Sequence, residues 1–234
     1  MSEQPLLSPI RFLVRTLTKF KVIHQERVPE KGSVLMTTNH LSRLDTPLLL
    51  AIADRRDFVG IIAKEYQEKS LIKWVLEKVG TMIWMDRDAT DFSAIREALH
   101  HLRHGSFVGI APEGTRSRET KGLLKGKSGA ALMAVRAGVP ILPVGLIGSD
   151  KIYRNWMRLK RPPIIVNVGE SYILPDIGKE DRQAWILRCT DEIMCRIAAL
   201  LPPEYHGHYT DHPRLKTLLQ ETTADDLSFA DDSE

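Results

Sequence analysis

The sequence predicts a single α/β domain: a mostly parallel or mixed β-sheet with helices on both faces, preceded by a short amphipathic helix. Two observations lead to this expectation. Short apolar runs, β-branched in places and bounded by Gly, Pro and Asp, alternate with helical patterns along the chain. A length of 234 residues suits one well-buried domain and is short for two. The alternation does not say whether every strand is parallel.

Seven runs are expected to form the strands of this sheet. They are residues 21–28, 33–38, 57–63, 81–85, 106–111, 140–147 and 164–169. Helical patterns cover residues 45–53, 70–79, 90–103, 127–137 and 179–200. Gly138 follows the fourth of these patterns, where a helix commonly ends on glycine. The main domain is therefore expected to span residues 20–207.

The N-terminal segment, residues 1–19, has a character of its own. Arg11, Arg15 and Lys19 recur every four residues and share one face of a helix, and an apolar set formed by Ile10, Leu13, Leu17 and Phe20 lies opposite. A basic amphipathic helix is typical of proteins that bind a membrane surface. The alternative is a first helix that packs on the body and leaves its cationic face in solvent.

Charge is distributed unevenly along the chain. From residue 220 onward there are six acidic residues and no Lys or Arg, so residues 208–234 are expected to form an acidic, disordered tail. Without those six, 33 basic residues stand against 24 acidic ones, a net charge of +9. That balance favours an anionic partner, either a phosphate-bearing small molecule or an anionic membrane. Nucleic acid is disfavoured because aromatic residues make up only 6% of the chain and no nucleic-acid-binding motif is present.

Other features predict a cytoplasmic protein attached peripherally to the inner face of the cell membrane. No apolar run approaches the ~18 residues that a transmembrane helix needs, and no signal peptide is visible at the start. Cys189 and Cys195 lie on one helical pattern with a spacing that places them poorly for a disulfide, so they are expected to be reduced. The histidines show no zinc-like spacing, and no metal is expected.

The first candidate site is the run Asn-His-Leu-Ser-Arg-Leu-Asp at residues 39–45. It follows an apolar strand and opens a helix, so His40 is expected at the carboxyl end of a strand, a common place for ligand sites in α/β sheets. Asp45 would hold one tautomer of His40 and stabilise its imidazolium form, as general-base catalysis requires. The alternative is that Asp45 only caps the following helix.

Three further motifs follow strands or form them. Arg87 follows the strand at 81–85 after one intervening residue, and the alternative is a surface arginine paired with Asp86 or Asp88. The run Pro-Glu-Gly-Thr-Arg-Ser-Arg at 112–118 offers a glycine for close backbone approach, hydroxyl groups, and a guanidinium suited to phosphate. Pro140 belongs to an apolar strand with two prolines, a pattern that fits a kinked pocket wall or an edge strand.

Together and in this order, the four motifs resemble those of the glycerophospholipid acyltransferases, most closely the bacterial 1-acyl-glycerol-3-phosphate acyltransferases. The resemblance spans about residues 33–144, and the pairing of Asn-His-x4-Asp with Pro-Glu-Gly-Thr-Arg is its specific part. It implies that His40 is the base and Asp45 its partner. It implies substrate-binding roles for further residues: Arg87, Glu113, Gly114, Thr115, Arg116 and Pro140. Lys64 follows the strand at 57–63, where a further phosphate contact is expected from its position alone.

The resemblance also implies the substrates. The chain is expected to move an acyl group from acyl-CoA or acyl carrier protein, without a cofactor, to the 2-hydroxyl of a lysophospholipid at an anionic membrane surface. Ala111 stands where the family usually has Phe, which leaves the shape of the pocket open. Two alternatives remain: another acceptor, such as glycerol-3-phosphate or a different lysolipid, or a non-catalytic basic membrane-binding protein. The second would leave His40 and Asp45 unexplained.

Overall fold

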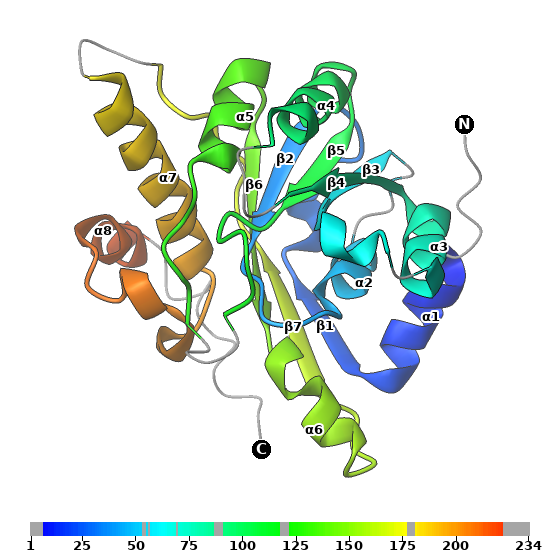
Figure 1. Cartoon of the computed structure of the whole chain (residues 1–234). Coiled ribbons are helices and arrows are strands. Elements are labelled where there is room, and N and C mark those ends of the chain that lie inside the picture. The colour runs from blue at the N-terminus through cyan, green and yellow to red at the C-terminus, as the bar shows by residue number, and fades with distance from the viewer. Residues whose placement is uncertain are drawn as a thin grey trace.

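Seven strands form one continuous β-sheet at the centre of the protein (Figure 1). The structure is a computed structural model, and it describes residues 7–52, 55, 57–68, 70–86, 91–117, 122–176 and 181–221. The strands are β1 (Lys19–Ile23), β2 (Val34–Thr38), β3 (Phe58–Ala63), β4 (Thr81–Met85), β5 (Phe107–Ile110), β6 (Ile141–Ile147) and β7 (Pro163–Val168). Each run predicted as a strand overlaps one of them, and six of the runs agree with the strand to within one residue at each end. The exception is the run at 21–28, because β1 begins at Lys19 and ends at Ile23, and residues 25–27 form the short 3-10 helix η1 (Gln25–Arg27) instead.

The strand order is β1-β7-β6-β2-β5-β3-β4. Neighbouring strands are parallel except for β6 and β7, which run antiparallel. This confirms the prediction of a mostly parallel or mixed sheet. Strands β2 to β6 all end at the same side of the sheet, which we call the carboxyl edge. β7 and β1 run the other way, so both begin at the carboxyl edge.

Helices cover both faces of the sheet (Figure 1). One face carries α4 (Phe92–Arg103), α5 (Gly129–Ala137) and α7 (Arg182–Ala198), and the other carries α1 (Leu7–Leu17), α2 (Asp45–Leu50) and α3 (Ser70–Val79). All five helices predicted for the main domain are present. α6 (Ile152–Trp156) and α8 (Pro213–Glu221) are additional to the prediction.

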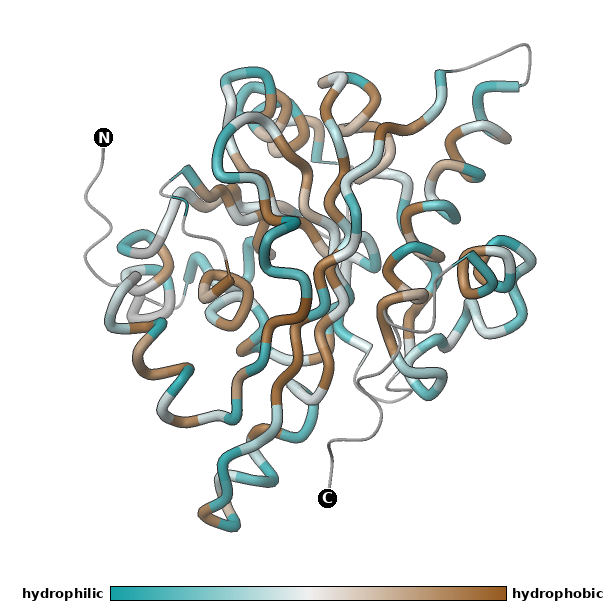
Figure 2. Tube along the Cα trace, turned by 180° about the vertical axis from the view of Figure 1, so that it is seen from behind, coloured by the Kyte–Doolittle hydropathy of each residue, from teal (hydrophilic) through white to brown (hydrophobic). Residues whose placement is uncertain are grey.

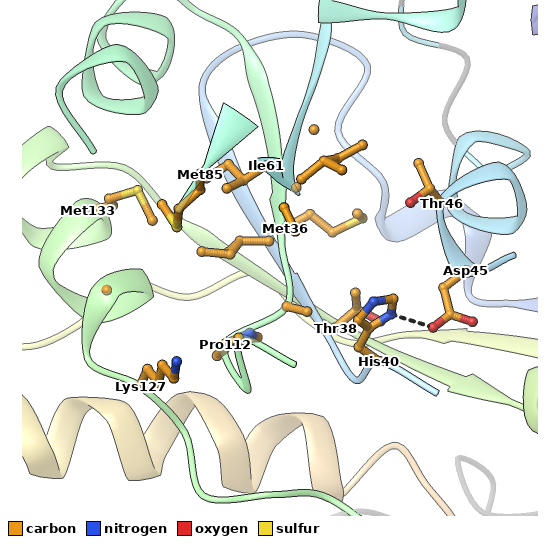
Figure 3. Close-up of a pocket in the computed structure, with 18 of the residues that line it drawn as sticks. Met36, Thr38, His40, Asp45, Thr46, Ile61, Met85, Pro112, Lys127 and Met133 are labelled. Atoms are coloured by element: carbon orange, nitrogen blue, oxygen red, sulfur yellow. Dashed lines mark hydrogen bonds and ion pairs between the residues drawn. The ribbon is translucent and has the colours of Figure 1, made fainter. Parts of the chain in front are cut away.

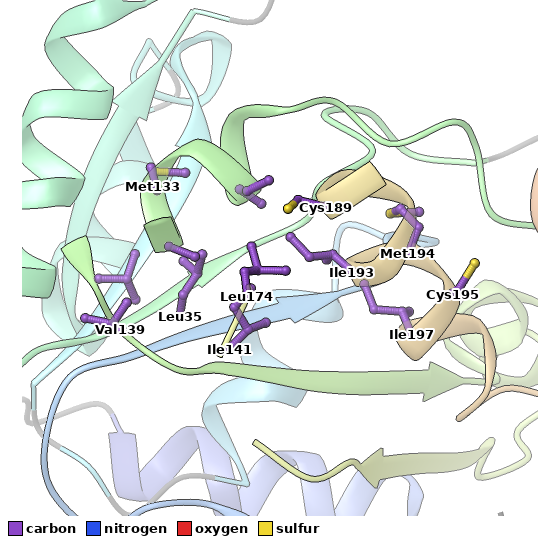
Figure 4. Close-up of a cluster of buried hydrophobic side chains, with 14 of the residues drawn as sticks. Leu35, Met133, Val139, Ile141, Leu174, Cys189, Ile193, Met194, Cys195 and Ile197 are labelled. Atoms are coloured by element: carbon purple, nitrogen blue, oxygen red, sulfur yellow. The ribbon is translucent and has the colours of Figure 1, made fainter. Parts of the chain in front are cut away.

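The hydrophobic core has two parts because successive side chains of a strand point to opposite faces. Leu35 belongs to the cluster under α4, α5 and α7, whereas the next residue, Met36, belongs to the cluster under α1 and α2. Figure 4 shows the first cluster, in which Leu35 and Ile141 from the strands lie near Ile193 and Ile197 of α7. Hydrophobic residues are correspondingly concentrated along the strands in Figure 2.

The strand with two prolines is central rather than at an edge. β6 lies between β7 and β2, so the edge-strand interpretation is wrong. Pro140 precedes the first residue of β6. Pro143 is tolerated inside the strand because pairing with β7 begins only at the next residue, Val144. The carbonyl of Pro143 still accepts a hydrogen bond from Gly169 N at 2.9 Å.

Helix α1 lies within the segment predicted to be amphipathic, but its apolar residues divide between two surfaces. Val14 is buried and Ile10 is partly buried, and both pack on the core beneath α2. Phe12, Leu13 and Leu17 are exposed. The prediction of a single apolar face that contains both Ile10 and Leu13 is therefore wrong, because Ile10 faces the core and Leu13 faces solvent. Among the helices that the structure describes, none is long and apolar enough to cross a bilayer.

The packed body extends past residue 207, where the sequence placed the start of the tail. Tyr209 is fully buried, and Leu215 and Leu218 of α8 are buried against α7. Their spacing within one short helix provides an apolar face that the acidic composition of this region concealed. The body therefore reaches Glu221, and the disordered tail stays a prediction for residues 222–234, which lie outside the described ranges.

Candidate active site

The loop at residues 39–45 joins β2 to α2 at the carboxyl edge. Asn39, its first residue, is buried and fixes the loop to the neighbouring strand β6. Its side-chain nitrogen donates to Leu146 O, and its side-chain oxygen accepts from Leu146 N, both at 2.8 Å. This two-way contact holds the next residue, His40, at the end of β2.

His40 and Asp45 form the central contact of the site (Figure 3). Nδ1 of His40 lies 2.7 Å from Oδ2 of Asp45, and the same oxygen accepts from the backbone N–H groups of Leu41 at 2.8 Å and Ser42 at 2.9 Å. An ionised carboxylate only accepts hydrogen bonds, so Nδ1 carries the proton and Nε2 keeps a lone pair. That is the tautomer a general base needs.

Asp45 is not the helix cap that the alternative interpretation described. Leu44 occupies the N-cap position of α2, and Asp45 is the first helical residue. Its buried carboxylate points back to the preceding loop and to His40 rather than to the first turn of the helix. The role of Asp45 is therefore to shape the loop and orient the imidazole.

Glu113 holds the 39–45 loop from a second side. It is buried on the turn after β5, and its two carboxylate oxygens accept from His40 N at 2.9 Å and Leu124 N at 2.8 Å. Burial raises the pKa of Glu113 to about 7, although both N–H donors favour the ionised form. Its oxygens contact backbone rather than the pocket, so Glu113 positions other residues instead of binding a substrate directly.

A pocket of about 700 Å³ opens beside His40 (Figure 3). This volume is within the range of roughly 300–1,000 Å³ that is typical of sites for small molecules. Its lining is mostly apolar, and it runs from the 39–45 loop toward both core clusters. The apolar lining residues include Met36, Leu49, Phe58, Ile61, Leu76, Met85, Ile95, Leu132 and Met133.

Two paired glycines shape the sheet side of the pocket. Gly60 of β3 lies opposite Gly109 of β5, and Met36 of β2 lies opposite Gly109 on the other side. A Cβ atom on Gly109 would lie 3.0 Å from both Met36 Cε and Phe58 Cζ. The glycines therefore allow the long side chains of Met36 and Phe58 to lie flat against the sheet.

The residues predicted from the Pro-Glu-Gly-Thr-Arg motif have different positions. Gly114 lines the pocket with a φ of 67°, and Thr115 is exposed beside it. The guanidinium of Arg116 lies 6.0 Å from the ring centre of Tyr66, which itself lines the pocket. Arg116 is thus at the rim of the pocket, where the sequence placed a phosphate contact.

The other predicted substrate contacts are farther away or outside the described residues. Lys64 begins a short 3-10 helix, η2 (Lys64–Tyr66), directly after β3 at the carboxyl edge, and it is exposed. Pro140 lies at the opposite edge, because it precedes the strand β6 that ends beside His40. The pocket-wall role predicted for Pro140 does not match this position. Arg87 lies outside the residues that the structure describes.

Two cations that the sequence reasoning missed line the pocket: Arg43 and Lys127. Within the described ranges, neither forms an ion pair. Lys127 lies beside Pro112 (Figure 3), and its backbone N–H donates to Pro112 O at 2.8 Å. A Cβ atom on Gly114 would lie 2.9 Å from Lys127 Cδ, so the glycine makes room for the lysine stem. The close approach expected at Gly114 is therefore made by this side chain.

The site offers acid–base groups and cations rather than metal ligands. In the parts of the chain that the structure describes, no group of three or more His, Cys, Asp or Glu side chains is placed to hold a metal ion. His100 of α4 and His104, the residue that follows α4, have ring centres 4.2 Å apart, but neither lines the pocket.

Comparison with known proteins gives one family. The family model described as Acyltransferase matches residues 19–147. The 1-acyl-sn-glycerol-3-phosphate acyltransferase of Borreliella burgdorferi is 30% identical over 139 residues, which are 58% of this chain and 54% of that protein. The enzyme of the same name from Salmonella typhimurium is 32% identical over 143 residues, 57% of this chain and 56% of that protein. The chain thus spans about half the length of the curated relatives it matches.

The fold is similar to that of a solved structure. The crystal structure of the 1-acyl-sn-glycerophosphate (LPA) acyltransferase PlsC from Thermotoga maritima matches with a TM-score of 0.57 and 22% sequence identity. The match covers 80% of this chain and 77% of the other. At this identity the likeness concerns the fold alone.

Proposed function

The chain belongs to the acyltransferase family, and we propose that it transfers a fatty acyl group from a thioester to the 2-hydroxyl of 1-acyl-glycerol-3-phosphate, giving phosphatidic acid. The donor is acyl-CoA or acylated acyl carrier protein, and no cofactor or metal enters the proposed chemistry. The acceptor is suggested by the names of the matched relatives. The reaction type is supported by the residues of this chain.

The observation that carries the proposal is the contact of 2.7 Å between His40 Nδ1 and Asp45 Oδ2 beside the apolar pocket. Asp45 fixes the tautomer that leaves Nε2 basic, and its negative charge stabilises the imidazolium that forms during proton transfer. A non-catalytic membrane-binding protein would have no need of this pair or of a pocket beside it.

In the proposed mechanism, the acceptor hydroxyl attacks the carbonyl carbon of the thioester while His40 Nε2 removes the hydroxyl proton. The new C–O bond forms a tetrahedral intermediate, which collapses as the C–S bond breaks. The thiolate leaves with the sulfur electron pair and takes the proton back from His40. A thiol pKa of about 8.5 makes the thiolate a good leaving group, so little acid assistance is needed.

The cations around the pocket support a substrate that carries a phosphate. Arg43 and Lys127 line the pocket, and Arg116 lies at its rim. Together with Arg87 and Lys64, they are proposed to hold the phosphate of the acceptor and so to place its hydroxyl beside His40. Positioning of this kind can lower a reaction barrier by several kcal/mol.

The apolar part of the pocket is proposed to hold the acyl chain of the donor. Its lining includes Met36, Phe58 and Met133, which come from both faces of the sheet around the carboxyl edge. A long hydrocarbon chain would be removed from water there, and burial of each CH₂ group contributes about 0.8 kcal/mol.

Attachment to an anionic membrane is proposed as well, as a peripheral protein on the inner face of the cell membrane. Phe12, Leu13 and Leu17 of α1 expose apolar surface next to the cation Arg15, which is the combination that a membrane-surface helix uses. A lysophospholipid acceptor lies in the bilayer, so attachment there would bring the site to its substrate.

An acceptor screen tests the proposal. The purified protein is incubated with one donor, acyl-CoA or acylated acyl carrier protein, and one acceptor, and the product lipid is identified by mass. The acceptors, tested one at a time, are lysophosphatidic acid, glycerol-3-phosphate and lysophosphatidylcholine. We expect product from lysophosphatidic acid, and none from the His40→Ala variant. Product from glycerol-3-phosphate or lysophosphatidylcholine alone would establish a different acceptor. Product from no acceptor with either thioester donor would refute the proposed activity.

A further inference from the structure

The segment that follows β6 is basic and carries large apolar side chains that face solvent. Residues 151–161, which we call the α6 tip, contain five Lys or Arg residues and no acidic residue. Two of its large apolar side chains are almost wholly in solvent: Met157 is 81% exposed and Leu159 is 97% exposed. Tyr153 is exposed as well. Apolar side chains gathered in one exposed place indicate a surface that contacts a partner.

The backbone of the α6 tip is built to display these residues. Leu159 has a φ of 54°, in the left-handed region that non-glycine residues rarely adopt. Three backbone hydrogen bonds hold the turn: Arg158 N to Asn155 O at 2.9 Å, Leu159 N to Trp156 O at 2.9 Å and Lys160 N to Asn155 O at 3.0 Å. A leucine held in this conformation and facing solvent has a conformational cost without a packing gain within the chain.

The fold places the α6 tip on the same edge of the sheet as His40. β6 is the parallel neighbour of β2, with Thr38 opposite Val144, so both strands end at the carboxyl edge. Asn39, next to His40, is bonded in both directions to Leu146 near the end of β6. The chain then leaves this edge and projects from the body as α6, at the bottom of Figures 1 and 2.

Specific contacts fix the α6 tip to the end of α1. Trp156 Nε1 donates to Leu17 O at 3.1 Å. The guanidinium of Arg161 donates to Arg15 O and Thr18 O, each at 2.6 Å. These three hydrogen bonds fix the position of the tip relative to the C-terminal end of α1. Arg161 is engaged in holding α1, while Arg154, Arg158 and Lys160 are exposed and form no ion pair with another described residue.

We infer that the α6 tip is a second membrane-contact element, which inserts Met157 and Leu159 into a bilayer and places Arg154, Arg158 and Lys160 among anionic headgroups. Charge decides the occupant, because a cationic rim around an apolar end is complementary to an anionic lipid surface. The inference deepens the proposed function, since it rests on a lipid acceptor. It adds the element that would orient the carboxyl edge toward the membrane.

Vesicle binding tests this inference without depending on catalysis. The full-length protein is sedimented with vesicles of pure phosphatidylcholine and with vesicles of an equal mixture of phosphatidylcholine and phosphatidylglycerol. The Met157→Ser/Leu159→Ser variant is expected to bind the mixed vesicles at least about tenfold more weakly. Ile173→Ser is the matched control, because Ile173 is 72% exposed on another part of the surface, and it should bind like the wild type.

A charge variant separates the two parts of the surface. Arg154→Gln/Arg158→Gln/Lys160→Gln should bind the mixed vesicles about tenfold more weakly, and its binding should depend less steeply on salt than that of the wild type. Its weak binding to pure phosphatidylcholine should not change. Equal losses on both vesicle types would contradict a role in recognising anionic headgroups.

Fluorescence reports insertion directly. A fluorophore sensitive to polarity is attached at Leu159→Cys or, as a control, at Ile173→Cys; labelling is selective because Cys189 and Cys195 are buried. We expect a blue shift on mixed vesicles only for the label at position 159. The absence of a shift there, or binding by Met157→Ser/Leu159→Ser equal to that of the wild type, would overturn the inference. The inference would also be overturned if Met157→Ser/Leu159→Ser bound vesicles normally but had a lower molecular mass in solution than the wild type. That result would mean that the tip is an interface between copies of the protein.

Activity on detergent-dispersed lysophosphatidic acid distinguishes this inference from the proposed function. The tip variants should stay within about twofold of the wild type in that assay, because surface substitutions away from the site have small effects. A wild-type protein that binds vesicles through the tip but acylates no acceptor would leave the inference intact and refute the proposed function.

Discussion

Two places in the molecule bring a histidine against an aspartate. At the carboxyl edge, His40 Nδ1 lies 2.7 Å from Asp45 Oδ2. Between α7 and α8, His212 Nδ1 lies 3.2 Å from Cys195 Sγ, and its Nε2 lies 3.9 Å from Asp191 Oδ2. By residue type alone, the second place resembles a nucleophilic Cys-His-Asp triad more closely than the first.

Access and charge separate them. His40 lines the large pocket, whereas Cys195 is fully buried and does not. Burial raises the pKa of the Cys195 thiol to about 12, with further contributions from the carboxylates of Asp191 and Glu192. A thiol reacts as the thiolate, so this one is inert at neutral pH. The Cys195 group is part of the packing between two helices, and the His40 group is the candidate active site.

The surrounding ions differ in the same way. Next to Cys195, Glu192 accepts from Arg196 Nε and Arg214 Nε, each at 2.6 Å. Arg214 also forms an ion pair with Glu221, so two cations and two carboxylates neutralise one another within the protein. Beside His40, Arg43 and Lys127 line the pocket without an ion pair to any described residue. Cations without a carboxylate partner next to a cavity indicate an anionic ligand, and a closed ion-pair group indicates stability.

The largest effect is expected when the His40–Asp45 pair is broken. Asp45→Asn removes the negative charge that stabilises imidazolium and allows the wrong tautomer, so kcat should fall by roughly 10²–10⁴, by analogy with the serine-protease triad. An asparagine oxygen can still accept from the loop N–H groups, so the melting temperature should change little. Steady-state kinetics and thermal unfolding measure the two quantities.

The same pair gives a test of coupling. His40→Ala should be at least as inactive as Asp45→Asn, and the double variant little worse than His40→Ala alone, because the two residues act as one unit. Near-normal turnover in Asp45→Asn would show that the aspartate is only a structural residue of the loop. The His40–Asp45 pair would then be structural, as we expect the Cys195 group to be.

A smaller effect is expected at Lys127. Lys127→Met keeps the stem that lies over Gly114 and removes the charge, so the KM for the phosphate-bearing acceptor should rise by about 10- to 100-fold, the value of a charge-assisted hydrogen bond. The KM for the thioester should move less. Lys125→Met is the matched control, since Lys125 is exposed on the same loop but does not line the pocket. Equal changes in the two variants would argue against a specific contact.

Glu113 should affect the dependence of stability on pH. Its pKa is about 7 in the folded protein and 4.5 as a free group. Between these values the unfolded chain has lost the proton and the folded protein still holds it, so the free energy of unfolding should fall as pH rises from 4.5 to about 7. The total is on the order of 3 kcal/mol, at about 1.4 kcal/mol per unit of pKa.

Denaturant unfolding across this pH range, for wild type and Glu113→Gln, measures the effect. The variant should lack the fall in stability. The kcat of Glu113→Gln should also fall by about two- to tenfold. The amide nitrogen of the glutamine cannot accept a hydrogen bond, so either His40 N or Leu124 N would lose its partner and the 39–45 loop would be held less firmly. Identical pH profiles for the two proteins would mean that Glu113 is ionised throughout the range.

Most of the fold and the central pair of the site follow from local patterns. The strands are short apolar runs separated by helical periods, and such alternation determines an α/β sheet. His40 and Asp45 are five residues apart, so a single loop brings them together. The direction of β6 relative to β2 cannot be predicted from local sequence. Because the two strands are parallel, Pro140, which precedes β6, lies at the edge opposite His40, which follows β2, although both residues belong to recognisable motifs.

The missed features depend on contacts between distant segments. Lys127 reaches the pocket because its loop folds back on Pro112. No spacing of residues in the sequence predicts this contact. Gly114 was the only indication in the sequence. A glycine there predicts that another group approaches the backbone closely, but it does not identify that group as the Lys127 side chain. Helix α8 was not predicted because its apolar face is short and adjoins acidic residues. Its structure depends on packing against α7, a contact between distant segments.

The smallest effect is expected at Cys195, where the comparison can be broken most directly. Cys195→Ala removes a buried sulfur that no substrate reaches, so kcat should stay within about twofold of the wild type. Loss of its packing should lower the free energy of unfolding by about 1 kcal/mol. His212→Ala, which removes the partner of the thiol, should likewise keep its turnover. If Cys195→Ala instead lost activity as His40→Ala does, with an unchanged unfolding midpoint, the buried group would be part of the reaction and access would not be the property that separates the two regions.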